Sequence, residues 1–82
     1  MRGEAGLVME NLSIIQKEII RFLQIKRATY AQPVNSEKIG GYLNVTPSYV
    51  REQAKRLEKK GVIAVRRGPG GGYFYLYDRL EG

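Results

Sequence analysis

The sequence predicts an α+β fold in which three helices precede a two-stranded β-hairpin. Three observations support this: a sharply bounded amphipathic helix at residues 47–60, two shorter helical patterns before it, and two β-prone runs after it that flank a glycine-rich tract. This order of elements is typical of a winged helix-turn-helix, in which the third helix is the recognition helix and the hairpin forms the wing.

Length and charge agree with a single small domain that meets a polyanion. The 82 residues include 14 Lys and Arg but 8 Asp and Glu, which leaves a formal net charge of +6. A chain this short buries only about 60% of its unfolded surface on folding, so its stability should be modest. Half of the basic residues lie in one stretch: Arg51, Lys55, Arg56, Lys59, Lys60, Arg66 and Arg67. We expect a DNA-binding domain at residues 12–80, after a disordered N-terminal arm at residues 1–11.

The composition also excludes several kinds of chemistry. The chain has no Cys and no His, which removes disulfides, Cys/His zinc sites, iron–sulfur ligation and His-based acid–base catalysis. No apolar run approaches the roughly 18 residues that span a bilayer. We therefore expect no cofactor, no metal ligands, no catalytic residues and no membrane partner, and we expect a cytoplasmic protein that is not an enzyme.

The first helix follows a capping box formed by Ser13 and Gln16. Its apolar stripe consists of Leu12, Ile15, Ile19, Phe22 and Leu23. Three further isoleucines, Ile14, Ile20 and Ile25, fall outside the stripe, so the apolar face is broader than one packing neighbour requires. The surplus fits either a homodimer contact or a helix that the C-terminal strand partly covers.

A linker over Ala28–Asn35 leads to a short second helix, predicted at Glu37–Leu43, with Ile39, Tyr42 and Leu43 placed to be buried. Two adjacent glycines, Gly40 and Gly41, should each weaken this helix by about 1 kcal/mol relative to Ala. A close crossing with the recognition helix would explain them. Asn44 and Val45 form the turn between the two helices.

The recognition helix, residues 47–60, has clear ends and two distinct faces. Thr46 can cap the first free amides, Pro47 suits the first helical position, and Gly61 can adopt the left-handed conformation that ends a helix. The buried stripe is Val50, Ala54 and Leu57, and the opposite face carries Ser48, Glu52, Lys55 and Lys59. One face is therefore core and the other is available to a partner.

The wing, residues 66–73, is the glycine-rich part of a hairpin between a strand at Val62–Arg67 and a strand at Tyr73–Tyr77. Glycines without side chains would let the backbone approach the minor groove closely, while arginines at the base supply charge. A phosphate-cradling loop is disfavoured because a strand, rather than a helix, follows the glycines. Tyr73, Tyr75 and Tyr77 alternate with Phe74 and Leu76, and alternation alone does not decide which row is core.

These elements define a predicted DNA-binding set. Ser48, Tyr49, Glu52 and Lys55 would enter the major groove, where Glu52 could accept a hydrogen bond from cytosine N4. Arg51, Arg56, Arg66 and Arg67 would contact phosphates, and the glycine tract, including Gly68, Gly70 and Gly71, would follow the minor groove. Ser36 and Thr46, at the starts of the second and third helices, complete the set.

The runs Thr46-Pro47-Ser48-Tyr49-Val50, Leu57 to Ile63, and Arg67-Gly68-Pro69-Gly70-Gly71-Gly72-Tyr73 resemble the helix-turn-helix and wing of the Rrf2-type bacterial transcription regulators. The resemblance covers about residues 36–73, whereas residues 12–27 and 33–36 look more like other bacterial winged-helix repressors. It implies a DNA-binding transcriptional regulator, with Ser48 and Tyr49 at the tip of the recognition helix and Arg67 to Gly72 in the wing.

This sequence departs from that family at three points. Its relatives often carry three cysteines for an iron–sulfur cluster and continue past the wing into a long dimerisation helix, so the cluster, redox sensing and that dimer are not carried over. Phe74 stands where the family usually has a basic residue.

Double-stranded DNA is the expected partner. A homodimer through the first helix or the C-terminal strand is a second possible assembly. Two alternatives are a protein–protein adaptor that uses the surplus apolar surface, and single-stranded nucleic-acid binding through the tyrosine strand.

Overall fold

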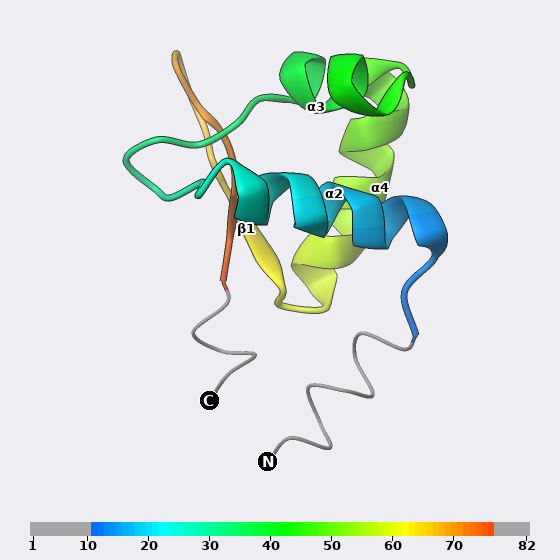
Figure 1. Cartoon of the computed structure of the whole chain (residues 1–82). Helices are drawn as coiled ribbons and strands as arrows, with labels where there is room; N and C mark the ends of the chain where they lie inside the picture. Colours follow the sequence, from blue (N-terminus) through cyan, green and yellow to red (C-terminus); the bar gives the residue numbers. More distant parts are fainter. Residues whose placement is uncertain (1–10, 77–82) are drawn as a thin grey trace.

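A computed structural model describes residues 11–76. The described elements are α2 (Ile14–Ile25), α3 (Ser36–Leu43), α4 (Pro47–Lys59), β1 (Ile63–Arg66) and β2 (Gly72–Tyr75). In Figure 1, α2 crosses in front of α4, α3 lies at the N-terminal end of α4, and the hairpin stands beside the helices. The predicted α+β layout of three helices and a two-stranded hairpin is confirmed. The proposed N-terminal arm, apart from Asn11, and residues 77–80 of the proposed domain lie outside the described residues.

Helix α2 begins and ends at motifs that its own sequence provides. The Ser13 hydroxyl accepts the Gln16 amide N–H at 3.2 Å, and the Gln16 side-chain oxygen accepts the Ser13 amide N–H at 3.1 Å, which confirms the capping box. At the other end, Ala28 N–H donates to Leu23 C=O and Arg27 N–H donates to Gln24 C=O. This is a Schellman motif, and it places Arg27 in the left-handed region at φ 53°.

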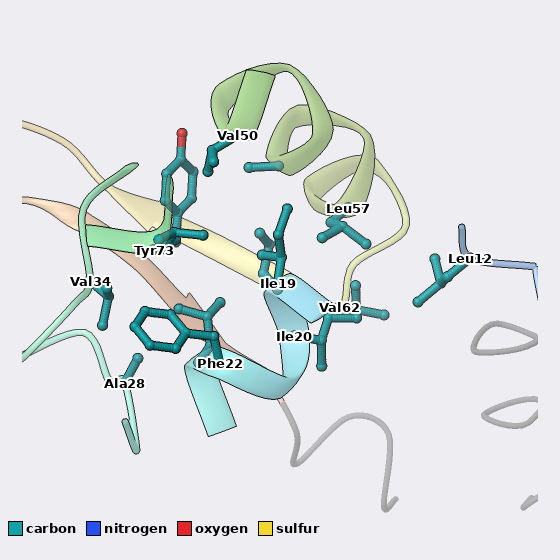
Figure 2. Close-up of a cluster of buried hydrophobic side chains, with 14 residues drawn as sticks. Leu12, Ile19, Ile20, Phe22, Ala28, Val34, Val50, Leu57, Val62 and Tyr73 are labelled. Atoms are coloured by element: carbon teal, nitrogen blue, oxygen red, sulfur yellow. The ribbon is translucent and has the colours of Figure 1, made fainter. Parts of the chain in front are cut away.

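One hydrophobic core joins all five elements (Figure 2). Its buried members are Leu12, Ile19, Ile20, Phe22, Leu23, Ala28, Val34, Ile39, Val50, Ala54, Leu57, Val62, Ile63 and Tyr73. Ile20 was expected outside the core stripe but is buried, because α2 packs against α3, α4 and β2 at once. Ile14 and Ile25, in contrast, are exposed at opposite ends of α2.

Helix α3 starts one residue earlier than predicted, with Asn35 as its cap: the Asn35 side-chain oxygen accepts the Lys38 amide N–H at 2.8 Å. Gly40 faces the following turn, where a Cβ would lie 2.6 Å from the Val45 carbonyl oxygen. This bears out the expected close approach for Gly40 but not for Gly41, where a Cβ would meet nothing within 4 Å.

Tyr42 does not enter the core, contrary to expectation. It is 59% exposed because it lies at the edge of the α2–α3 contact. Its ring still stacks on Phe22, with centroids 4.2 Å apart and an interplanar angle of 23°. Tyr42 therefore covers a core residue without being buried itself.

The hairpin is antiparallel and is extended by the linker of residues 28–35. Ile63 pairs with Tyr75 and Val65 with Tyr73, so these four side chains share the face that packs on the helices. Val34, expected to be a plain linker residue, forms a bridge to β2: its amide donates to the Tyr73 carbonyl at 2.9 Å and its carbonyl accepts from the Tyr73 amide at 2.8 Å. Of the two alternating rows of β2, the tyrosine row therefore faces the core at Tyr73.

Two of the wing glycines have reasons within the fold. Gly72 belongs to β2 rather than to the loop, and a Cβ there would lie 2.6 Å from the Val34 carbonyl carbon. A Cβ on Gly71 would overlap the Arg66 carbonyl oxygen. Close approach to DNA is therefore not needed to explain these two glycines, and the DNA contact predicted for Gly71 stays a prediction.

Candidate nucleic-acid interface

An open groove of about 400 Å³ runs between α4 and the hairpin. It is lined by Ser48, Arg51, Glu52, Lys55, Glu58, Val65, Arg67 and Tyr73. Five of these belong to the predicted DNA-binding set, and all five are exposed. The structure therefore brings Lys55 of α4 and Arg67 of the wing to one side of the molecule, together with the polar residues of the first turns of α4.

Local contacts determine the direction in which α4 presents this face. The Thr46 hydroxyl accepts the Tyr49 amide N–H at 3.2 Å, and Pro47 occupies the first helical turn, as predicted. At the C-terminal end, Gly61 N–H donates to Glu58 C=O, and Gly61 has the left-handed φ of 78° that its position requires. Val50, Ala54 and Leu57 are completely buried, so the groove face is held outward.

A side-chain hydrogen bond between helices also orients α4. The Gln16 side-chain Nε2 donates to Gln53 Oε1 at 2.9 Å, and Gln16 is buried. The same side chain completes the capping box of α2, so one amide group both begins α2 and aligns α4 against it. Sequence reasoning identified Gln16 only as a cap and did not detect its link to Gln53, which lies on α4 between the core stripe and the exposed face.

Arg51 is held in place by two hydroxyl groups. Its guanidinium donates to Ser36 Oγ at 3.1 Å and to Ser48 Oγ at 3.3 Å. Ser36 is buried at the start of α3, so this predicted site residue reaches the groove only through Arg51. A guanidinium fixed in this way between α3 and α4 is preorganised to donate hydrogen bonds to an anion in the groove.

Tyr73 lies at the floor of the groove. Its ring belongs to the core, and in Figure 2 its hydroxyl oxygen points past Val50, out of the hydrophobic cluster. Burial raises the pKa of the Tyr73 hydroxyl above its ordinary value, and the Glu58 carboxylate raises it further, against the opposing effect of Arg51 and Arg67. The hydroxyl therefore remains a neutral hydrogen-bond donor at neutral pH.

Arg66 does not line the groove, although the sequence placed it with Lys55 and Arg67. Alternation along β1 sends Arg66 to the opposite face of the hairpin from Val65 and Arg67. There its guanidinium donates to the carbonyl oxygens of Tyr30 and Gly70, both at 2.7 Å. Charge alone could not have distinguished the two adjacent arginines, but strand alternation could.

The remaining predicted residues lie outside the lining of the groove. Thr46 and Arg56 are exposed on α4 or at its start, and Gly68 and Gly70 are exposed in the wing. Tyr49 is 39% exposed near the N-terminal end of α4. None of these five residues lines the groove, so their predicted DNA contacts stay predictions.

The tyrosine strand is poorly suited to stack on single-stranded bases. Tyr73 is buried with its ring in the core, and Tyr75 is partly buried and packs against the same core. Base stacking requires an exposed aromatic face, which these two rings do not offer. Tyr77, the third ring of the predicted platform, lies outside the described residues.

Three helices and a glycine-tipped hairpin, with a groove between the third helix and that hairpin, define a winged helix-turn-helix domain. The chain belongs to the Rrf2 family: residues 18–78 match the family model described as an iron-dependent transcriptional regulator. This match includes most of α2, although residues 12–27 look more like other bacterial winged-helix repressors. Neither curated proteins nor solved structures gave a match.

The residues of this chain do not fit the iron in the family's description. Cys and His are absent from all 82 residues, so the thiolate and imidazole ligands that iron–sulfur sites use are missing. Within residues 11–76, Asp and Glu do not form a group of three that could hold a metal ion. We therefore assign iron no part in the action of this chain. The same stretch contains no helix long and apolar enough to cross a membrane.

Proposed function

We propose that this chain binds double-stranded DNA sequence-specifically as a transcriptional regulator, with α4 in the major groove and the wing at the adjacent minor groove. The observation that supports this most strongly is the convergence of Lys55, Arg51 and Arg67 on one groove between α4 and the hairpin. A net charge of +6 adds a long-range attraction to polyanions. Family membership supports the regulatory role.

Within this proposal, base contacts come from exposed side chains in the first three turns of α4. Ser48, Glu52 and Lys55 project from the side that faces away from the buried stripe. Glu52 would accept from cytosine N4 and Lys55 would donate to guanine O6 or N7, each worth about 1–3 kcal/mol of discrimination between bases. Tyr49 would add apolar contact beside them.

Phosphate contacts come from the arginines. Arg51 is preorganised by Ser36 and Ser48, and Arg67 extends from the end of β1 toward the same groove. Each phosphate contact should contribute about 0.9 to the slope of log K against log salt, and it should act alike on all sequences. Base contacts and phosphate contacts can therefore be separated experimentally.

The test begins with selection of fragmented genomic DNA on the purified chain, followed by fluorescence anisotropy with the enriched duplex over a range of salt concentrations. We expect Arg67→Gln to weaken binding on every duplex and to reduce the salt slope by about 0.9. Lys55→Ala should change base preference at one position by roughly 1–3 kcal/mol. Arg21→Gln, on the exposed side of α2 and outside the groove, is the charge-matched control for Arg67.

The proposal fails if Arg67→Gln and Lys55→Ala both bind duplex DNA as the unchanged protein does, or if Arg21→Gln has the same effect as Arg67→Gln. A palindromic enriched site would in addition support a homodimer, since half-site spacing reflects the two-fold symmetry of the protein. The exposed Ile14 and Ile25 of α2 are the apolar residues available for that predicted contact.

A further inference from the structure

We propose that Arg66 is a positioning residue that fixes the wing against the linker of residues 28–35, so that the wing is already in its DNA-binding position before DNA arrives. This inference rests on the proposed function for its effect on binding, but the clamp itself can be tested without DNA. It assigns Arg66 a role distinct from that of Arg67, although the two are adjacent and carry the same charge.

The clamp is built from three hydrogen bonds of one guanidinium. Arg66 Nη2 donates to the Gly70 carbonyl at 2.7 Å, which closes the wing loop. Arg66 Nη1 donates to the Tyr30 carbonyl at 2.7 Å and to the Ala31 carbonyl at 3.4 Å, which ties that loop to the linker. A planar group with donors on both sides can join two carbonyl-bearing segments at once, and an ammonium group on a flexible stem does so poorly.

Aromatic contacts support the same arrangement. The Arg66 guanidinium lies 5.4 Å from the centroid of the Tyr30 ring, and the Tyr30 ring meets Phe74 edge-on at 5.8 Å. The linker turn is itself closed, because Thr29 and Gln32 exchange backbone hydrogen bonds. Arg66 thus connects the wing loop to a defined turn rather than to a loose segment.

Without this clamp, the wing loop would keep its own hydrogen bond from Gly71 N–H to Gly68 C=O at 2.9 Å, but within the described residues no hydrogen bond would tie the loop to the linker turn. The Val34–Tyr73 bridge holds β2 at its first residues, while the loop at residues 67–71 projects beyond it. A loop that is mobile in the free protein must be ordered when DNA binds, and this ordering lowers affinity without removing any charge contact. The predicted signature of a lost clamp is therefore weaker binding at an unchanged salt slope.

The experiment compares Arg66→Gln, Arg66→Lys and Arg67→Gln in the full chain. Circular dichroism first verifies that each variant is folded. Backbone ¹⁵N order parameters of the free protein are then measured at Gly68, Gly70 and Gly71, and anisotropy with the selected duplex gives affinity and salt slope. We expect both Arg66 variants to lower the order parameters and to weaken binding roughly tenfold, with the salt slope unchanged. Arg67→Gln should leave the order parameters unchanged and reduce the slope.

Two results would overturn the proposal. If Arg66→Lys retains full affinity while Arg66→Gln reduces the salt slope, then Arg66 contacts phosphate through its charge. If neither variant changes the order parameters of the wing, there is no clamp. Should the unchanged protein fail to bind any duplex, the proposed function fails, but the order parameters still decide whether Arg66 holds the wing.

Discussion

The adjacent glycines of α3 provide a sharp test of the packing between α3 and α4. Gly40→Ala and Gly41→Ala make the same chemical change one residue apart in one helix, and each should gain about 1 kcal/mol of intrinsic helix propensity. At Gly41 the new methyl group meets nothing within 4 Å, so the gain should be realised in full. At Gly40 the methyl group would lie 2.6 Å from the Val45 carbonyl oxygen and 3.4 Å from the Pro47 nitrogen.

The contact at Gly40 involves backbone, which cannot rotate away as a side chain would. Relief requires the turn to move, and this strains the hydrogen bond from Val45 N–H to the Gly40 carbonyl at 2.9 Å. Overpacking of this kind costs about 1–3 kcal/mol, and a backbone contact this short belongs at the upper end. After the propensity gain is subtracted, Gly40→Ala should lose about 1–2 kcal/mol, so the two variants should differ by about 2–3 kcal/mol.

Thermal unfolding followed by circular dichroism should resolve this difference. For a domain of this size, 1 kcal/mol corresponds to about 4–8 °C in Tm. Gly41→Ala should therefore raise Tm by about 4–8 °C, and Gly40→Ala should lower it by a similar or larger amount. An equal rise in both variants would show that the turn yields freely and that the close approach of α3 to α4 does not constrain position 40.

Two further predictions concern the end of α2 and the floor of the groove. Arg27 adopts a left-handed φ of 53°, so Arg27→Gly should raise the free energy of unfolding by about 0.5–1 kcal/mol in urea titrations. Lys26→Gly, at the right-handed C-cap, should lower the free energy of unfolding instead. A lower free energy of unfolding in both variants would contradict the Schellman geometry. Burial, then Glu58, raise the pKa of Tyr73 above the ordinary 10.0, so the neutral hydroxyl stabilises the fold below about pH 10 and this contribution is lost as the pH rises through the raised pKa. As the pH is raised from 9 past 10.0, Tyr73→Phe should therefore lose less free energy of unfolding than the unchanged protein does, and parallel losses would argue against the burial of this hydroxyl.

Features set by neighbouring residues could be predicted from the sequence. Thr46, Pro47 and Gly61 mark the ends of α4 because capping and left-handed backbone depend on residue type at fixed offsets. The buried stripe of α4 followed from helical periodicity in the same way. The third helix, the hairpin and five of the eight residues that line the groove could therefore be predicted from the sequence.

Features that depend on contacts distant in sequence could not be predicted in this way. Ile20 is buried and Tyr42 exposed because the width of an apolar face depends on how many neighbours surround the helix. The Gln16–Gln53 hydrogen bond and the Val34 bridge join segments that are distant in sequence, and local sequence patterns do not predict how such segments align. The orientation of the Arg66 side chain could be predicted in part. Strand alternation separates Arg66 from Arg67, but it does not identify the carbonyl groups of Tyr30 and Gly70 as the hydrogen-bond partners of Arg66.

The bridge between Val34 and Tyr73 has a consequence for building chimaeras. An isolated two-stranded hairpin is marginally stable in water, and here the strand order is completed by a residue from the segment between the first two helices. Gly72 is part of the same junction, because its missing side chain makes room for Val34 and Asn35. Grafting residues 63–75 onto a related regulator would therefore transfer the amino acids of the wing but not its shape, unless residues 33–35 were transplanted with them.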